Sequence, residues 1–432
     1  MASRTPKPTR TTIRAYQVGF GDCFLMSVDY DDDPDVGVRH VLIDFGTTAL
    51  PKHKPRKSMQ DIAQSIRSVT GGKLHGVVAT HRHKDHISGF SGSAGEIIMS
   101  LRPEVVAQPW TEDPKAAEDA LMPTPQTRVG LYAATLGSMQ SVANFALKEV
   151  KGGAPGIAKG VRTQIEFIGD DNLSNREAVE NLAKMAQVDT VYLHYGMKSG
   201  LEEILPGVKI HVLGPPSLEQ TDSILTQRAR DTDEFWHFQS NAGHRAASKR
   251  RLFPNSKTWG KKRKELPIET RWFLPRMNQI RGEQLLQIVR SLDHAMNNTS
   301  LILLFEVGSK KFLFSGDAQI ENWEYCLHTA RDRKKQHRLL EEVDFYKVGH
   351  HGSLNATPKT LWGLFNNRGN QSAPERMRSV VSTMADKHGS LHRGTEVPRK
   401  KLTDALKAET DYKTTQTIRR KDEFFHELVF DA

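Results

Sequence analysis

The sequence predicts an α/β protein in which sheets and helices are stacked in layers. Short apolar runs typical of buried strands recur along the 432 residues, and they alternate with segments whose apolar residues have helical spacing. Hydrophobic residues make up 37% of the chain and charged residues 26%, which is typical of a globular protein with a core. No internal repeat is present in the sequence, so a repeat architecture is not expected.

The first 110 residues are expected to form four strands and one amphipathic helix. The helix is expected at 58–69, where Met59, Ile62, Ile66 and Val69 fall on one side. The strands are expected at 13–18, 23–28, 40–44 and 75–80.

Two segments interrupt this pattern and are interpreted as insertions in a single domain spanning residues 12–432. Residues 112–190 are rich in alanine and are expected to be mostly helical, with a capping box formed by Ser174 and Glu177. Residues 218–290 are basic and contain interleaved tryptophans. The remaining strands are expected at 208–213, 301–306, 311–315, 343–348 and 379–382.

The net charge of +10 is concentrated in one stretch of the second insertion. Residues 242–281 contain twelve basic and two acidic residues, which accounts for the whole excess. Such a segment favours a polyanionic partner, although a solvated loop is the alternative interpretation. The predicted nucleic-acid contacts are Lys261, Lys262, Arg263 and Lys264.

The sequence indicates a cytoplasmic protein without a membrane partner. No apolar run reaches the roughly 18 residues of a membrane span, and no apolar region of a secretion signal follows the basic N-terminus. Cys23 and Cys326 fit no zinc spacing, so we expect two buried free thiols in a reducing compartment. Protein partners are not predicted.

The segment from Thr80 to His86 contains three histidines and one aspartate within six residues, directly after an apolar strand. Imidazole and carboxylate groups are the usual ligands of zinc, manganese and iron. A loop at a strand end can present His81 and His83 to one metal, while Asp85 and His86 serve an adjacent one. The sequence therefore predicts a cofactor of one or two divalent ions, zinc or manganese.

This segment resembles the His-x-His-x-Asp-His motif of the metallo-β-lactamase superfamily. Further landmarks of that family follow in the family's order, namely Asp44 at the end of an early strand, Ser315-Gly316-Asp317, and Gly349-His350-His351-Gly352-Ser353. The resemblance extends from about residue 12 to about residue 400. It implies an αββα sandwich of the metallo-β-lactamase type, here with helical and basic insertions.

The resemblance also implies a role for each motif residue. Asp317 would bridge two metals, and Asp44 would support the metal loop through hydrogen bonds. The family form His-x-Gly-Ser/Thr selects His350 rather than His351 as the late ligand. The implied metal ligands are His81, His83, Asp85, His86, Asp317 and His350.

One departure from the family pattern points to a particular branch of the family. The family has a histidine before the strand that leads into Gly-Asp, where this chain has Asn297-Asn298-Thr299-Ser300. Asn298 is therefore expected beside the site, and either a single ion or an oxygen-rich manganese site becomes plausible. Three features together resemble the hydrolase domain of bacterial competence DNA-uptake channel proteins. They are the asparagines, the segment Lys347–Ser353 and the sequence Gly19-Phe20-Gly21-Asp22.

The implied activity is hydrolysis by a metal-activated water. Asp85 would orient that water or take its proton, and His351 and His388 are candidates to protonate the leaving group, unless they are structural histidines. Lys347 could face a phosphate, although a lysine at a strand end is more often exposed.

Three functions remain open at this point. The first is a phosphodiesterase or nuclease acting on nucleic acid. The second is a metallo-hydrolase of a small ester, lactone or cyclic nucleotide, and the third is a non-catalytic nucleic-acid-binding module. Salt-sensitive binding of nucleic acid separates the first from the second, and metal content separates both from the third.

Overall fold

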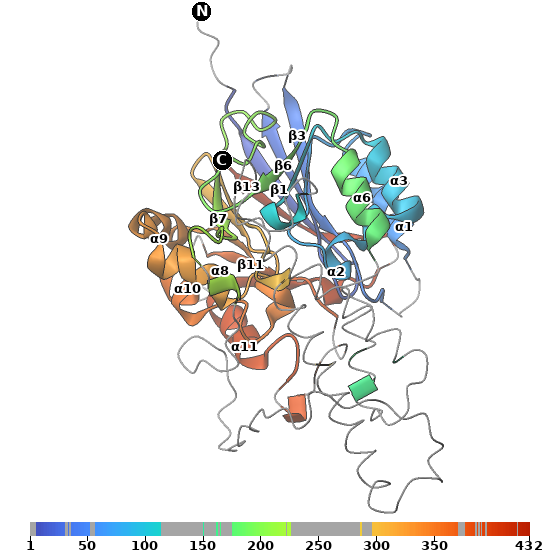
Figure 1. The fold of residues 1–432 in the computed structure, drawn as a ribbon. Helices are drawn as coiled ribbons and strands as arrows, with labels where there is room; N and C mark the ends of the chain where they lie inside the picture. Colours follow the sequence, from blue (N-terminus) through green and yellow to red (C-terminus); the bar gives the residue numbers. More distant parts are fainter. Residues whose placement is uncertain are drawn as a thin grey trace, which may run out of the picture.

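The structure is a computed structural model of an α/β protein with two mixed sheets and helices on their outer sides (Figure 1). The figure shows α1, α3 and α6 beside one sheet, and α9, α10 and α11 beside the other. The described residues are 6–30, 33, 36–51, 57–113, 150, 161–162, 165, 175–221, 223–225, 286, 296–369, 376–384, 387, 389, 391–393, 395–420 and 422–432.

The first sheet has seven strands and begins as a meander. β1, β2 and β3 pair antiparallel in sequence order, and β13 pairs antiparallel with the free side of β1. β3, β4, β5 and β6 then pair in parallel. In spatial order the strands are β13 (Phe425–Asp431), β1 (Arg10–Tyr16), β2 (Cys23–Tyr30), β3 (Gly37–Phe45), β4 (Gly76–Val78), β5 (Val105–Pro109) and β6 (Asp189–Leu193).

The second sheet has six strands and combines a parallel half with an antiparallel half. β9 to β12 pair in parallel, whereas β7, β8 and β9 pair antiparallel. In spatial order the strands are β12 (Asp411–Thr414), β11 (Arg378–Val381), β10 (Phe345–Lys347), β9 (Lys310–Phe314), β8 (Ile302–Val307) and β7 (Lys209–Gly214).

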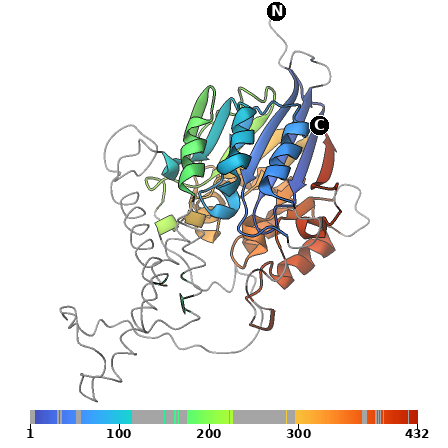
Figure 2. The ribbon, with the colours of Figure 1, turned by 90° about the vertical axis from the view of Figure 1, so that its right-hand side faces the viewer.

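Three apolar clusters hold the layers together. One cluster lies between the sheets and contains Phe24, Phe305 and Phe314. A second joins the first sheet to its three helices, which Figure 2 shows lying against the strands. A third joins the second sheet to its own helices. Within the described residues, the α-helices longer than four residues are α1 (Met59–Val69), α3 (Gly92–Ser100), α6 (Arg176–Lys184), α8 (Ile320–Glu324), α9 (Arg333–Glu341), α10 (Lys359–Leu364) and α11 (Lys400–Glu409).

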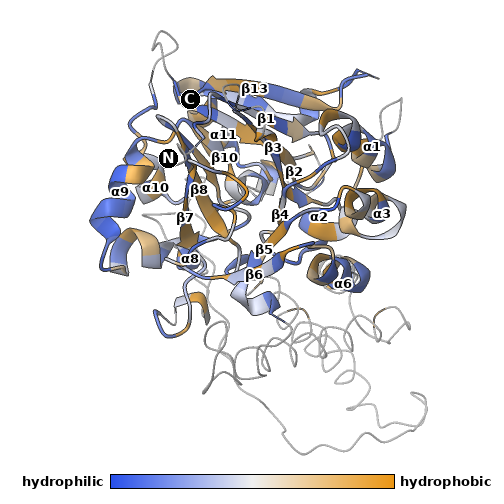
Figure 3. Cartoon of the chain, turned by 90° about the horizontal axis from the view of Figure 1, so that it is seen from above, coloured by the Kyte–Doolittle hydropathy of each residue, from blue (hydrophilic) through white to orange (hydrophobic). Residues whose placement is uncertain are grey.

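The hydropathy colouring in Figure 3 follows these layers, because the apolar strands lie between two rows of helices that turn polar sides outward. α1 illustrates the local cause. Its apolar residues Ile62, Ala63 and Ile66 are buried against the sheet, and Ser58 and Asp61 form a capping box at its start. The sequence therefore specifies both where this helix begins and which face it buries.

The predicted strands and the helix at 58–69 are confirmed, with boundaries shifted by a few residues. The two sheets also include β6, β7, β12 and β13, which lie between the insertions or near the end of the chain. The end of the expected 112–190 insertion contributes α6 and the start of β6 to the layered core. Most of that segment, Ser174 included, and nearly all of residues 218–290 lie outside the described residues.

Both cysteines are buried free thiols, as expected. Among the described residues, no helix combines the length and the apolar character that crossing a membrane requires.

Candidate metal centre

The candidate site lies where loops from both sheets meet. The histidine-rich segment follows β4 and continues into the short helix α2 (Lys84–Ile87), and Asp44 lies at the end of the neighbouring strand β3. Asp317 follows β9, and the turn Gly349–Gly352 follows the parallel neighbour β10. Because the carboxyl ends of parallel neighbours lie at one edge of a sheet, residues distant in sequence come together there.

Asp44 fixes the orientation of His86. Its carboxylate accepts hydrogen bonds from the backbone N–H and the hydroxyl of Thr80, at 2.7 and 2.8 Å. Asp44 Oδ2 also lies 2.7 Å from His86 Nδ1, which therefore donates its proton to the carboxylate. His86 Nε2 is then the nitrogen left to bind either a metal or a second proton, and it lies 3.2 Å from Asp317 Oδ2. The supporting role expected for Asp44 matches this geometry.

His351 is oriented in the same way from the second sheet. Its Nδ1 donates to the backbone carbonyl of Ser382 at 2.8 Å, so Nε2 is the nitrogen left to bind either a metal or a second proton. That nitrogen lies 2.8 Å from Asp85 Oδ2 and 3.7 Å from Asp317 Oδ2. The Ser382 hydroxyl donates in turn to the carbonyl of Gly21, which anchors the support.

Asp85, His86, Asp317 and His351 thus form a buried group that fits a metal ion. Each offers one ligand atom, and the four atoms lie within 4.8 Å of one another. Two imidazole lone pairs directed at two carboxylates repel unless a cation or protons lie between them. His86 Nε2 is also buried without a hydrogen-bond partner in the structure. Two nitrogens and two carboxylate oxygens are a donor set typical of zinc or manganese.

Within the group, the imidazoles and the carboxylates shift one another's pKa values. Burial alone would lower the pKa of His86 and His351, but the surrounding carboxylates, Asp317 first, outweigh it and raise both values. Burial likewise would raise the pKa of Asp85 and Asp317, and the neighbouring histidines, His86 first, lower both instead. Without an ion, protons on the imidazoles compensate the carboxylates.

His81 and His83 adjoin this group but do not join it. His81 Nε2 lies 2.9 Å from His83 Nδ1, so the two imidazoles hydrogen-bond each other. The His81 ring lies 4.1 Å from the His86 ring, measured between centroids. Burial, and then the neighbouring His86 and His83, hold the pKa of His81 well below its usual value, so this imidazole is neutral.

The two late histidines lie in different positions relative to the buried group. His351, rather than the predicted His350, belongs to the group of four, whereas His350 Nε2 lies 3.8 Å from Asp317 Oδ2 at the partly exposed margin. Both histidines adopt left-handed backbone conformations, with φ of 42° and 53°. A motif spacing does not reveal such a turn, which directs His351 inward.

Lys347 is buried, contrary to the expectation of an exposed strand end. Its Nζ forms an ion pair with Asp22, lies 3.4 Å from Asp317 Oδ1 and donates to the carbonyl of Gly316 at 2.8 Å. Burial would lower the pKa of this ammonium, but Asp22 and then Asp317 raise it above its usual value. Lys347 therefore stays charged and holds one oxygen of Asp317, while the other oxygen faces the imidazoles.

The structure describes only one of the remaining predicted residues. Asn298 is buried, and its side-chain oxygen has no hydrogen-bond partner in the structure. His388 and the basic run Lys261, Lys262, Arg263 and Lys264 lie outside the described residues.

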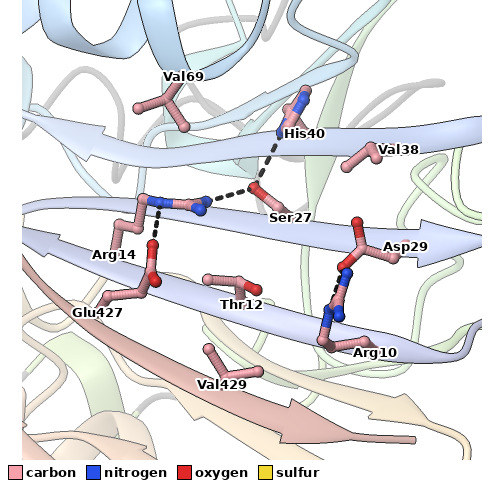
Figure 4. A pocket seen from close by; sticks show the side chains of 10 residues that line it. All are labelled: Arg10, Thr12, Arg14, Ser27, Asp29, Val38, His40, Val69, Glu427 and Val429. Atoms are coloured by element: carbon pink, nitrogen blue, oxygen red, sulfur yellow. Dashed lines mark hydrogen bonds and ion pairs between the residues drawn. The ribbon is translucent and has the colours of Figure 1, made fainter.

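A separate cavity of about 420 Å³ lies on the outer face of the first sheet, away from the metal loops (Figure 4). Both arginines that line it are already paired, Arg10 with Asp29 and Arg14 with Glu427. Because these charges balance within the cavity, it gives no sign of which ligand it would bind.

Comparisons with known proteins add no family assignment. No protein-family model matches the sequence, and no curated protein matches it significantly.

Proposed function

We propose that the protein is a metal-dependent hydrolase of the metallo-β-lactamase type that cleaves phosphodiester bonds. One observation carries the proposal. Two buried imidazoles, each held by a hydrogen bond from Nδ1 to a protein acceptor, direct Nε2 toward the carboxylates of Asp85 and Asp317. This combination of ligand and supporting acceptor is typical of metal-binding histidines. The two-sheet architecture and the motif order support the same family type.

In this proposal Asp85, His86, Asp317 and His351 hold a divalent ion, and His81 and His83 offer ligands for a second one. The bound metal would supply an activated water and would polarise a phosphoryl oxygen. Asp85 receives the proton of the attacking water or orients it. His350, at the partly exposed margin, is placed to meet the departing oxygen. The net charge of +10 favours an anionic substrate.

The ligand assignment can be tested by comparing two adjacent histidines. His351→Ala is expected to remove bound manganese or zinc, because it deletes one of four ligands. His350→Ala is the matched control in the same turn, and it is expected to retain the metal. Metal content after gel filtration, measured by mass spectrometry, gives a readout that needs no substrate. Equal metal loss in both variants, or in neither, would exclude the proposed ligand set.

The reaction can be tested on a small chromogenic phosphodiester and on oligonucleotides, with manganese, zinc, magnesium or chelator. Asp85→Asn keeps the size of the side chain and is expected to reduce turnover at least 10²-fold, because it removes both a metal ligand and the group that receives the proton of the water. Hydrolysis of lactones or thioesters without any phosphodiester turnover would favour the small-substrate alternative instead.

A further inference from the structure

Five exposed basic residues surround the start and the outer face of α9, and we call them the α9 basic face. They are Arg331, Arg333, Lys334, Lys335 and Arg338. Gln336 and Leu340, on the other side of the helix, are buried against the protein. Figure 3 shows α9 at the rim of the molecule, mostly in the colours of hydrophilic residues.

The described acidic residues do not neutralise this face. None of the five basic side chains forms an ion pair with an acidic group in the described part of the chain. Asp332 is nearby, but its carboxylate accepts hydrogen bonds from the Tyr195 hydroxyl and the Gln336 amide. Glu342 pairs with Lys311 on the sheet. The basic face is therefore open to an external anion.

Most of these charges are unfavourable for the helix on its own, and Glu341, three residues after Arg338, offsets only part of the repulsion. Lys334 and Lys335 are each within one turn of Arg338, at spacings of four and three residues, where like charges repel. Arg333, Lys334 and Lys335 also occupy the first turn, which contains no acidic residue, and the helix dipole disfavours cations there. An anionic partner would relieve both effects.

The topology places the start of this face at the edge of the second sheet that carries the metal loops. β7 and β9 run in the same direction, because each pairs antiparallel with β8. Tyr195 connects the two regions, since its hydroxyl donates to Asp332 and its N–H donates to the carbonyl of Pro215, which follows β7. Pro215 and Asp317 thus lie at the same edge, two strand spacings or about 10 Å apart across the sheet.

We infer that the α9 basic face binds the phosphate backbone of a nucleic acid whose cleaved bond lies at the metal centre. The inference rests on the proposed function for the choice of nucleic acid among polyanions. The α9 basic face would be a contact surface in addition to the predicted basic run at 261–264. It would direct the nucleic-acid strand along α9 and away from the metal loops.

The test compares two triple variants by their binding of fluorescent oligonucleotides. Lys334→Gln with Lys335→Gln and Arg338→Gln neutralises the basic face. The matched control removes three exposed cations beside the first sheet, Arg67, Lys73 and Lys184, by the same change to glutamine. Single-stranded DNA, duplex DNA and RNA of random sequence are titrated at several salt concentrations with chelator present. Chelator makes binding independent of turnover, so failure of this inference is distinguishable from failure of the proposed hydrolysis.

We expect the α9 variant to bind at least one nucleic acid about tenfold more weakly than the control variant. The negative slope of log affinity against log salt concentration should become shallower by about two units. Each lost phosphate contact reduces its magnitude by about 0.7 to 0.9. Its thermal unfolding temperature should not decrease, because the substituted residues are exposed and repel one another. Equal binding by the two variants would overturn the inference. So would binding to vesicles of phosphatidylserine and phosphatidylcholine with no affinity for any oligonucleotide.

Discussion

Lys347→Met is expected to destabilise the protein strongly, because it removes a buried charge from its partner. The Lys347 side chain is 2% exposed and that of Asp22 is 0% exposed, so water cannot replace the ammonium. Breaking a buried ion pair by removing one partner costs about 3–5 kcal/mol. Because domains are stable by only about 5–15 kcal/mol, this loss would be a large fraction of the free energy of unfolding.

The measurement is urea unfolding followed by circular dichroism, with chelator present so that metal binding does not contribute. Adding Asp22→Asn to Lys347→Met removes both charges, and the double variant is expected to recover part of the lost stability. Recovery is incomplete because Asp317 also loses its contact with the ammonium. Lys209→Met is the control, since this lysine is 72% exposed in its pair with Glu306 and should contribute about 0–1 kcal/mol.

Two results would refute the reasoning. If Lys347→Met costs less than about 1 kcal/mol, as an exposed pair would, the charge is not needed for stability. If the double variant loses as much as the two single variants added together, the side chains act independently, and uncompensated charge is not the cause.

Three further predictions follow from the geometry. Asp44→Asn turns an acceptor oxygen into an amide donor and is expected to weaken metal binding about 10- to 100-fold, as measured by chelator competition. A Cβ at Gly46 would lie 2.5 Å from the α2 backbone, so Gly46→Ala should cost about 1–3 kcal/mol in urea unfolding, whereas Gly363→Ala, with open space, should not destabilise. Burial lowers the pKa of His40 to about 4 and of His75 to about 3, so both bind a proton only on unfolding. The free energy of unfolding should therefore decrease as the pH drops below 6.5, by up to about 1.4 kcal/mol per pH unit for each histidine. His75→Gln should reduce this pH dependence, as measured by urea titrations at several pH values.

The sequence predicted the elements whose local pattern is strong. β1 to β4, α1 and the β8–β9 hairpin all combine apolar periodicity with clear boundaries, such as the turn at Gly308. β5, β6, β12 and β13 were not predicted, and of these β13 pairs with β1 from the opposite end of the chain. Local propensity carries little information about such contacts.

The sequence predicted the candidate ligands that belong to recognisable motifs. It did not predict the groups from distant parts of the chain that orient those ligands or pair with them. Asp85, His86 and Asp317 follow from the motifs, and the structure brings them together. The carbonyl of Ser382, which orients His351, has no sequence signal, because every residue has a carbonyl. The burial of Lys347 depends on Asp22, more than three hundred residues away, and only the tertiary fold brings the two together.

The four candidate ligands come from different halves of the sandwich, and this has a consequence for the lifetime of the protein. Asp85 and His86 follow β4 of the first sheet, whereas Asp317 and His351 follow β9 and β10 of the second. An ion held by all four would act as a cross-link between the halves that exists only in the folded state. At a free metal concentration 100-fold above the dissociation constant, such a link adds about 2.7 kcal/mol to the free energy of unfolding. Cells short of the metal would then lose the protein to proteolysis as well as losing its activity, so its abundance would follow the metal supply.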